Sequence, residues 1–454
     1  MAYRSFDPFR QQLIAEYSTD SDKRLSEKIS TVHRAFKQWR LTSLEKRCEL
    51  VSNLANVLLA EKELFAETAV REMGKPVTQA IAEVEKCASL CHYYASNAAH
   101  FLQPDERKSG ARKSMVVYDP QGIILGVMPW NFPYWQVYRF LVPALLAGNC
   151  TVLKHASNVT GCALKIEESL EKAGFPDSVF RVILPDHNQL GNIISMPEIR
   201  GVALTGSNDA GSVIASHAGR YIKKSVLELG GSDPLIIFPD ANIEEAVAGA
   251  FTSRFLNNGQ SCIAAKRFIV HDSLADHFLH LLLEMIGKAP AGDPMKSDVY
   301  FSTVVSAAAA KEIHSQVERS VSMGARLVFG GGIDSGCPAC YNPAVLTDIP
   351  DKSPLAVDEI FGPVASVFRF RTVDEAQSVA NNSRFGLGAS VWSADEEFAL
   401  EFARNLDCGT VAINGFVRSD PAMPFGGVKD SGYGRELSKE AMHEFVNIKS
   451  LTVY

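Results

Sequence analysis

The chain has 454 residues, of which 46% are hydrophobic and 21% charged, and its formal net charge is −7. This length exceeds one ordinary hydrophobic core and predicts two or three domains, while the negative charge argues against a nucleic-acid partner. The apolar stretches are too short to cross a membrane, and the first residues, Met1 to Pro8, lack the apolar core of a signal peptide, so we expect a cytoplasmic enzyme.

The N-terminal part of the chain has a helical pattern. From residue 21 to about 100, apolar side chains recur every three or four positions. The segment Thr42 to Glu45 fits a capping box, and Gly74-Lys-Pro76 fits a helix stop. The period then changes, and 114–118 and 123–127 read as strands separated by a turn at 119–122.

Strand-like and helix-like segments alternate through the rest of the chain. Apolar runs occupy 150–154, 179–184, 201–204 and 224–229, with helical patterns between them. A second block of this kind begins at 234–238, continues through an amphipathic stretch near 243–256 and reaches about 415. This alternation predicts an α/β fold with two open-sheet domains and a cleft between them.

The cysteines do not form a regular framework. Their number is nine, and their spacing is irregular, which predicts mostly reduced thiols and no disulfide scaffold. Cys337 and Cys340 have the CxxC spacing of metal and redox sites, but no second pair of ligands accompanies them. We therefore interpret them as two small residues in a surface loop, and we expect no metal site.

Two glycine-flanked segments supply a carboxylate and a thiol. Glu228 precedes Leu-Gly-Gly, and Cys262 follows Gly-Gln-Ser. A cysteine thiolate attacks carbonyl carbons and leaves a thioester, which a carboxylate-activated water can hydrolyse. Asn131 lies in a proline-braced loop after a predicted strand, where its amide suits an oxyanion. Capping of the next helix explains Asn131 equally well.

Two strand ends are candidates for binding a dinucleotide. The turn from Thr205 to Gly211 enters a predicted helix, and its amide groups could hold a phosphate. It is not a GxGxxG fingerprint, and plain turn chemistry is the commoner explanation of such glycines. Lys154 at another strand end is equally ambiguous, because a lone lysine there is usually solvated.

Five short motifs stand out along the chain. In chain order they are Pro-Trp-Asn-Phe-Pro at 129–133, Leu-Glu-Leu-Gly-Gly at 227–231, Gly-Gln-Ser-Cys at 259–262, Glu-Ile-Phe-Gly-Pro-Val at 359–364 and Pro-Phe-Gly-Gly-Val-Lys at 424–429. Together they resemble the NAD(P)-dependent aldehyde dehydrogenase superfamily over nearly the whole chain. Within it, Leu-Lys-His-Ala at 153–156 and the segment 425–437 are most similar to the bacterial succinate-semialdehyde dehydrogenases.

The resemblance implies an aldehyde dehydrogenase-like fold with three parts. Residues 1–102 and 119–230 would form the NAD(P)-binding domain, and 231–432 the catalytic domain. Residues 103–118 and 433–454 would form a small β oligomerisation arm, which implies a homodimer or homotetramer. No membrane partner is implied.

The resemblance also implies a reaction, the NAD(P)-dependent oxidation of an aldehyde to a carboxylic acid. Cys262 matches the nucleophile, which forms a thiohemiacetal and then a thioester. Asn131 matches the oxyanion hole, together with the backbone N–H of Cys262, and Glu228 matches the base that activates water for deacylation. We expect Cys262 to be partly exposed in a polar cleft, with a thiolate fraction raised by its surroundings.

The cofactor is expected to be NAD or NADP. In NAD-preferring relatives a glutamate often follows the lysine by three positions, and here that position is Ser157. A neutral residue does not repel a 2′-phosphate, so NADP should be accepted as well as NAD. Cofactor-binding positions implied by the resemblance are Trp130, Lys154, Ser157, Gly206, Ser207, Leu229, Glu359 and Phe361.

The resemblance implies succinate semialdehyde as the substrate. Its carboxylate needs a cationic anchor, for which Arg139 matches an arginine of related enzymes, and Ser419 could add a hydroxyl contact. An ordinary helix-surface ion pair is the alternative for Arg139. Glutarate semialdehyde and simple aliphatic or aromatic aldehydes stay open as substrates. A non-catalytic relative, or one that passes its acyl group to coenzyme A, is disfavoured because Cys262 and Glu228 are both present.

Overall fold

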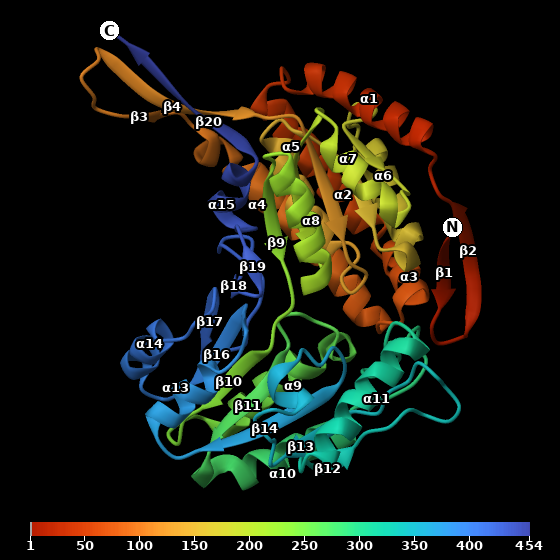
Figure 1. The fold of residues 1–454 in the computed structure, drawn as a ribbon, viewed down its shortest axis with the longest axis vertical. Helices are drawn as coiled ribbons and strands as arrows, with labels where there is room; N and C mark the ends of the chain where they lie inside the picture. Colours follow the sequence, from red (N-terminus) through yellow and green to blue (C-terminus); the bar gives the residue numbers. More distant parts are fainter. Residues whose placement is uncertain (1) are drawn as a thin grey trace.

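The protein consists of two bodies of packed helices and strands and a slender arm that projects from one of them (Figure 1). The computed structural model describes residues 2–454; Met1, the first residue of the expected first domain, lies outside the described residues. One body contains a six-stranded sheet in the order β19-β9-β8-β5-β6-β7 and the other a seven-stranded sheet in the order β12-β13-β14-β11-β10-β16-β17. The predicted α/β fold with two open sheets is confirmed.

The four N-terminal helices that the periodicity predicted share the hydrophobic core of the first body. The predicted capping box is wrong, because Ser43 rather than Thr42 caps the second helix and accepts a hydrogen bond from the backbone N–H of Lys46. A lysine at that position cannot return the bond to the cap. The predicted stop is confirmed, since Gly74 adopts a left-handed φ of 81°. The helices are α1 (Asp22–Trp39), α2 (Leu44–Ala60), α3 (Lys62–Met73) and α4 (Val77–Leu102).

A hairpin that the sequence pattern did not reveal precedes these helices. Its strands are β1 (Ala2–Asp7) and β2 (Gln12–Ser18), paired antiparallel. The Tyr3 hydroxyl donates a hydrogen bond to the carbonyl of Pro185, with 2.6 Å between the oxygens. The hairpin therefore lies along the first body, near α3 in Figure 1.

The first sheet is parallel except at one edge. The short strand β19 (Gly432–Tyr433) runs antiparallel to β9. The register aligns Val127 with both Lys154 and Leu204, and Thr205 with Glu228. The carboxyl ends of four strands therefore meet at one edge. The parallel strands are β5 (Ile123–Met128), β6 (Cys150–His155), β7 (Phe180–Val182), β8 (Ile199–Thr205) and β9 (Lys224–Glu228), with helices α5 (Trp135–Leu146), α6 (Thr160–Lys172), α7 (Leu190–Ser195) and α8 (Asn208–Arg220).

The second sheet is parallel except for β12 (Arg326–Gly330). Its central strands are buried, which matches their continuous apolar runs. Its parallel strands are β10 (Asp233–Ile237), β11 (Ala265–His271), β13 (Ala344–Thr347), β14 (Val364–Phe370), β16 (Gly388–Trp392) and β17 (Thr410–Ile413). Its helices are α9 (Ile243–Phe255), α10 (Asp272–Lys288), α11 (Ala307–Ser322), α12 (Pro354–Val357), α13 (Val373–Asn381) and α14 (Glu396–Arg404).

The arm is a separate three-stranded antiparallel sheet in the order β20-β4-β3. It is built from β3 (Asp105–Glu106), β4 (Lys113–Pro120) and β20 (Val446–Val453). The helix α15 (Ser438–Glu444) leads into it from the first body, and Figure 1 shows the C-terminus at its tip. Ile448, Leu451 and Val453 on its last strand are exposed.

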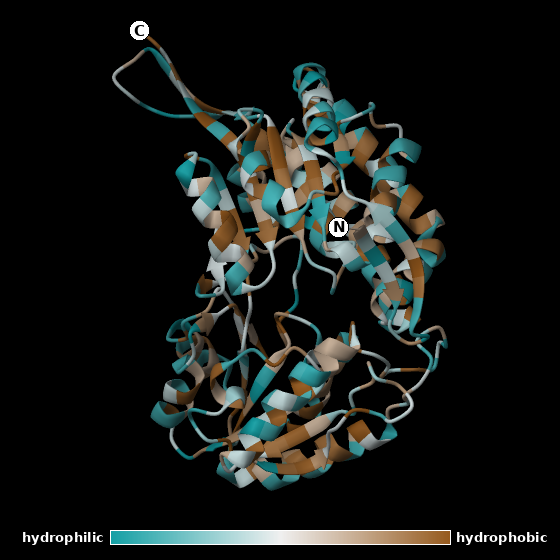
Figure 2. Ribbon diagram, turned by 45° about the vertical axis from the view of Figure 1, so that its right-hand side comes forward, coloured by the Kyte–Doolittle hydropathy of each residue, from teal (hydrophilic) through white to brown (hydrophobic). Residues whose placement is uncertain are grey.

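Hydrophobic residues concentrate on the strands and on the inward faces of the helices, while the outer helix faces are largely hydrophilic (Figure 2). Within residues 2–454, no helix is long and apolar enough to cross a membrane. In the same described part, no group of three or more His, Cys, Asp or Glu residues is placed to hold a metal ion.

The expected loop position of Cys337 and Cys340 is confirmed, but their interpretation as merely two small residues is wrong. They form a disulfide in the loop between β12 and β13. A tight turn brings them together, since the N–H of Cys340 donates to the carbonyl of Cys337 at 2.9 Å and the Cα atoms lie 5.2 Å apart. The expectation of mostly reduced thiols is confirmed by the seven free cysteines.

Candidate active site

The loop that carries Cys262 follows α9 and has an unusual backbone. Asn257, Asn258 and Gly259 all have left-handed φ values, of 55°, 52° and 71°. A Cβ atom on Gly259 would lie 2.4 Å from the carbonyl oxygen of Gly362. Only glycine fits there, which explains why a glycine stands three residues before the thiol.

A buried arginine fastens this loop to the Glu-Ile-Phe-Gly-Pro-Val motif. The Arg254 side chain donates to the carbonyl oxygens of Val364 at 2.6 Å, Ile360 at 3.0 Å and Gly259 at 3.3 Å. Carbonyl dipoles thus satisfy a guanidinium that is fully removed from water. Two motifs more than 90 residues apart in the chain are thereby held as one unit.

Asn131 is buried beside the same loop. Its side-chain Nδ2 donates to the backbone carbonyl of Gln260 at 3.0 Å, and its backbone carbonyl accepts from Nδ2 of Asn257 at 2.7 Å. It does not cap α5, which has no side-chain cap, so the capping interpretation is wrong. An amide carries two N–H groups, and one of them remains for an oxyanion at Cys262.

Cys262 is partly exposed and lines a cavity of about 610 Å³. Burial raises the pKa of its thiol to about 12, although the positive charges of Lys266 and Arg139 lower it in part. The expected rise in thiolate fraction is therefore wrong for this structure, because desolvation outweighs both cations. The thiol is protonated at neutral pH here.

Lys266 connects the Cys262 loop to a second motif. Its Nζ donates to the backbone carbonyls of Ser261 at 2.7 Å and Cys262 at 2.6 Å, and pairs with Oε1 of Glu359 at 3.1 Å. The same Glu359 oxygen accepts from the N–H of Gly231, also at 3.1 Å. The glycines after Glu228 are thus joined to the thiol loop.

Glu228 ends β9 and is only 2% exposed. Within residues 2–454, neither of its carboxyl oxygens has a hydrogen-bond partner. Burial, and next the negative charge of Glu436, raise its pKa well above the ordinary value, while Arg139 and Arg435 act in the opposite direction. The buried site therefore favours the protonated form of Glu228, which must lose its proton before it can act as a base.

Arg139 projects from α5 into the wall of the cavity. It is 3% exposed, forms an ion pair with Glu436, and stacks over the Phe425 ring at 4.6 Å. Its Nη2 also reaches the Thr205 hydroxyl at 3.4 Å. The alternative explanation of Arg139, an ion pair on the helix surface, is wrong because the pair with Glu436 is buried.

The candidate dinucleotide residues gather at the carboxyl edge of the first sheet. Lys154 is half-buried there, and burial lowers the pKa of its ammonium. Ser157 is exposed nearby, at the start of a short 3-10 helix, Ser157–Val159. Gly206 and Ser207 follow β8, and the Ser207 hydroxyl caps α8 by accepting from the N–H of Ala210.

Three further candidates complete this edge. Leu229 packs on α8 at Gly211, where an added Cβ would lie 2.6 Å from Cδ2 of Leu229. The Trp130 and Phe361 rings meet edge to face with centroids 5.7 Å apart. Because Trp130 follows β5 and Phe361 belongs to the second body, this aromatic pair spans the two sheets.

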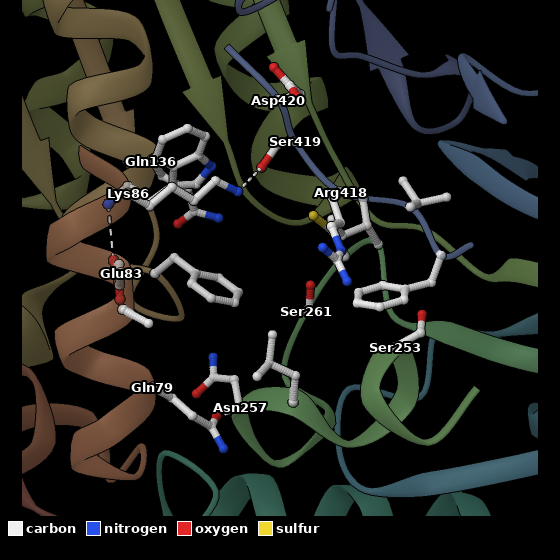
Figure 3. Close-up of a pocket in the computed structure, with 18 of the residues that line it drawn as sticks. Gln79, Glu83, Lys86, Gln136, Ser253, Asn257, Ser261, Arg418, Ser419 and Asp420 are labelled. Atoms are coloured by element: carbon white, nitrogen blue, oxygen red, sulfur yellow. Dashed lines mark hydrogen bonds between the residues drawn. The ribbon is translucent and has the colours of Figure 1, made fainter. Parts of the chain in front are cut away.

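Ser419, a substrate contact expected from the sequence, lies on the wall of the cavity and accepts a hydrogen bond from Nζ of Lys86 at 2.7 Å (Figure 3). The cavity also contains polar residues that were not predicted. Lys86 and Gln136 come from helices without a recognisable motif, so no local pattern could have identified them. Glu436 was within the recognised segment 425–437, but its pairing with Arg139 was not predictable from that segment alone.

Comparisons with known proteins agree with this geometry. The profile of the aldehyde dehydrogenase family matches residues 1–451. The chain is 40% identical over 453 residues to a probable succinate-semialdehyde dehydrogenase (NADP+) of Synechocystis, and 41% identical over 456 residues to succinate-semialdehyde dehydrogenase (NADP+) 1 of Mycobacterium bovis, with all of each chain covered. The structure of succinic semialdehyde dehydrogenase from Streptococcus pyogenes in complex with NADP+ matches with a TM-score of 0.97 and 35% identity, again over both chains entirely. The chain therefore belongs to the aldehyde dehydrogenase family.

Proposed function

We propose that this aldehyde dehydrogenase oxidises succinate semialdehyde to succinate and uses NADP, with NAD accepted as well. The observation that carries the proposal is the cavity that begins at Cys262 and has Arg139 and Ser419 on its wall. A thiol at one place and cationic and hydroxyl groups at another suit a substrate with an aldehyde and a carboxylate. The names of the relatives from Synechocystis and Mycobacterium bovis support the same substrate and NADP.

In the proposed mechanism the partly exposed Cys262 thiol gives its proton to solvent, and the resulting thiolate attacks the aldehyde carbon. Asn131 Nδ2 and the N–H of Cys262 hold the oxygen that becomes negative. After oxidation, the acyl group remains on sulfur as a thioester. Glu228, once ionised, takes a proton from a water that attacks this thioester, and the acid and the free thiol are released.

The residues at the carboxyl edge of the first sheet fit a dinucleotide. Lys154 carries a half-buried positive charge, and the α8 N-terminus directs backbone N–H groups outward beside Gly206 and Ser207. Lys154 and Ser157 would hold the adenosine ribose, and Glu359, Phe361, Trp130 and Leu229 the nicotinamide end. A bound NAD(P) supplies the acceptor for two electrons from the substrate.

We propose the division into domains as expected from sequence. Residues 1–102 and 119–230 would bind the dinucleotide, 231–432 would carry the nucleophile, and 103–118 with 433–454 would form the arm. The separate sheets support a division into three parts, although β19 at its 432/433 boundary pairs with the first sheet. We also propose a cytoplasmic location, which the seven free cysteines support.

We further propose that the arm joins copies of the chain into a homodimer or homotetramer. Its edge strands and the exposed side chains of Ile448 and Leu451 favour pairing with another chain. Sedimentation of the protein with Ile448→Lys and Leu451→Lys tests this. Both variants should shift the mass toward the monomer, and an unchanged mass would contradict the proposal.

A panel of aldehydes tests the activity. It should contain succinate semialdehyde, glutarate semialdehyde, butanal and benzaldehyde, each with NADP+ and NAD+, followed by absorbance at 340 nm. The expected result is the highest kcat/KM for succinate semialdehyde with NADP+. A higher value for butanal or benzaldehyde would reject the proposed substrate. KM values that favour NAD+ by orders of magnitude would reject the proposed cofactor preference.

The role of Arg139 needs a variant that keeps the buried pair balanced. Arg139→Ala alone leaves the Glu436 charge buried without a partner, which costs about 3–5 kcal/mol of stability. The double variant Arg139→Met with Glu436→Gln removes both charges. A larger loss of kcat/KM for succinate semialdehyde than for butanal is expected, and equal losses would reject Arg139 as an anchor.

A further inference from the structure

Lys86 reaches the active-site cavity from α4. Figure 3 shows its side chain extending from the helix across to Ser419, and Nζ donates to the Ser419 hydroxyl at 2.7 Å. The ammonium also lies over the Trp135 ring, 4.1 Å from its centroid. Both contacts fix the head of the side chain at the wall of the same cavity that Cys262 lines.

Lys86 is half-buried, and its ammonium differs from those of the neighbouring buried cations in having no carboxylate partner. Lys75 pairs with Glu83, and Arg139 pairs with Glu436. Among residues 2–454, no carboxylate lies within 4.0 Å of the Lys86 ammonium. A ring face and a hydroxyl attract an ammonium only weakly. Lys86 therefore holds a positive charge that an incoming anion can neutralise.

The surroundings make this charge costly without an anion. Burial, and next the positive charge of Arg139, lower the pKa of Lys86 to about 8, whereas Cys87, Glu83 and Asp420 act in the opposite direction. Asp420 is exposed and accepts from the N–H of Ala422 at 2.8 Å. A partly desolvated ammonium gains more from a new carboxylate partner than a solvated one.

Ser419 completes the anion site. Its oxygen accepts from Lys86, so its single hydroxyl proton is free to point away from the ammonium. A carboxylate beside Ser419 can then accept two hydrogen bonds, one from the ammonium and one from the hydroxyl. Arg139 adds a positive potential, although Glu436 already neutralises most of its charge.

We propose that Lys86 binds the carboxylate of the substrate and is the residue that makes this enzyme prefer aldehydes with a terminal carboxylate. The inference rests on the proposed oxidation of succinate semialdehyde and deepens it. Arg139, whose charge Glu436 partly neutralises, then adds positive potential to this anchor, while Lys86 and Ser419 contact the charged end of the substrate directly.

The test compares Lys86→Met with the parent enzyme, using NADP+ and two substrates, succinate semialdehyde and butanal. Loss of a charge-assisted contact should lower kcat/KM for the semialdehyde roughly 30-fold, mainly through KM, and change that for butanal less than about threefold. Lys86→Arg should keep the preference for the semialdehyde. The control is Lys62→Met. Lys62 pairs with Glu85 on the outer surface, at 2.5 Å, so this variant should leave kcat/KM for both substrates unchanged.

The outcomes distinguish a failure of the proposed function from a failure of the assignment of Lys86. If the parent enzyme does not prefer the semialdehyde over butanal, the proposed function fails. If the parent prefers it and Lys86→Met keeps that preference, the assignment of Lys86 is overturned while the function stands. A second measurement needs no variant: KM of the parent for the semialdehyde should rise as the pH passes about 8, while KM for butanal should not. A KM for the semialdehyde that stays constant across this range would also overturn the assignment.

Discussion

The ammonium of Lys266 lies 2.6 Å from the backbone carbonyl oxygen of Cys262. Lys266 is almost fully buried, and the same ammonium forms an ion pair with Glu359. One positive charge therefore links the thiol loop to the Glu-Ile-Phe-Gly-Pro-Val motif. The charge also lowers the pKa of the Cys262 thiol against the effect of burial. Structural support and control of reactivity therefore come from one side chain.

The variant Lys266→Met should make Cys262 less reactive. Without the nearby positive charge the thiol pKa rises further, so less thiolate is present at a given pH. The rate of alkylation by iodoacetamide, measured from pH 7 to 10, should fall about tenfold or more. An unchanged pH profile of alkylation would contradict this role. Lys62→Met again serves as the control.

The proton of Glu228 should set the pH dependence of deacylation. The pKa of Glu228 is raised in the structure, so the basic carboxylate form increases as the pH rises through that pKa. Turnover limited by thioester hydrolysis should therefore climb with pH, about tenfold per unit below the pKa, and then level off. Stopped-flow measurement of thioester decay with butanal as substrate reports this step without a charged substrate.

Glu436→Gln tests the same idea through the direction in which the pKa of Glu228 moves. The negative charge of Glu436 raises the pKa of Glu228, whereas Arg139 lowers it. Removal of the Glu436 charge also leaves Arg139 unpaired, so both effects lower the pKa of Glu228. The rising limb of the deacylation profile should move to lower pH. A shift to higher pH, or no shift, would show that Glu436 does not control this proton.

The secondary structure was largely predictable because most elements leave a local pattern. The N-terminal helices bury one face, and the central strands of the second sheet are apolar throughout. The hairpin β1–β2 was missed because β1 buries the polar residues Ser5 and Asp7 while it exposes Phe6, and because β2 exposes most of its side chains. The disulfide between Cys337 and Cys340 depended on a turn that CxxC spacing alone does not specify.

The site was predictable only where a motif reflects a local backbone requirement. The left-handed turn before Cys262 needs Gly259, so the glycine marks the proposed nucleophile. The ion pair between Arg139 and Glu436 joins residues almost 300 positions apart, and Lys86 meets Ser419 across an even larger gap. Such pairings follow from tertiary packing, and neither partner carries a local signal of the other.

Ser157→Glu should change the choice of cofactor. Ser157 is exposed near Lys154, where the resemblance places the adenosine ribose. A carboxylate there repels a 2′-phosphate and can accept hydrogen bonds from the ribose hydroxyls of NAD. KM for NADP+ should rise about tenfold or more, while KM for NAD+ should stay or fall. The neutral control Ser157→Gln should leave the ratio of the two KM values within about threefold.

Replacement of Cys262 and of Glu228 by alanine should separate the two half-reactions. Cys262→Ala removes the nucleophile, so neither a burst of reduced cofactor nor steady turnover is expected. Glu228→Ala should retain a burst close to one equivalent per site and lose steady turnover about 10²-fold or more, because the thioester persists. Rapid mixing followed at 340 nm measures both phases. The absence of a burst in Glu228→Ala, with the protein folded and binding NADP+ normally, would place Glu228 before oxidation rather than after it.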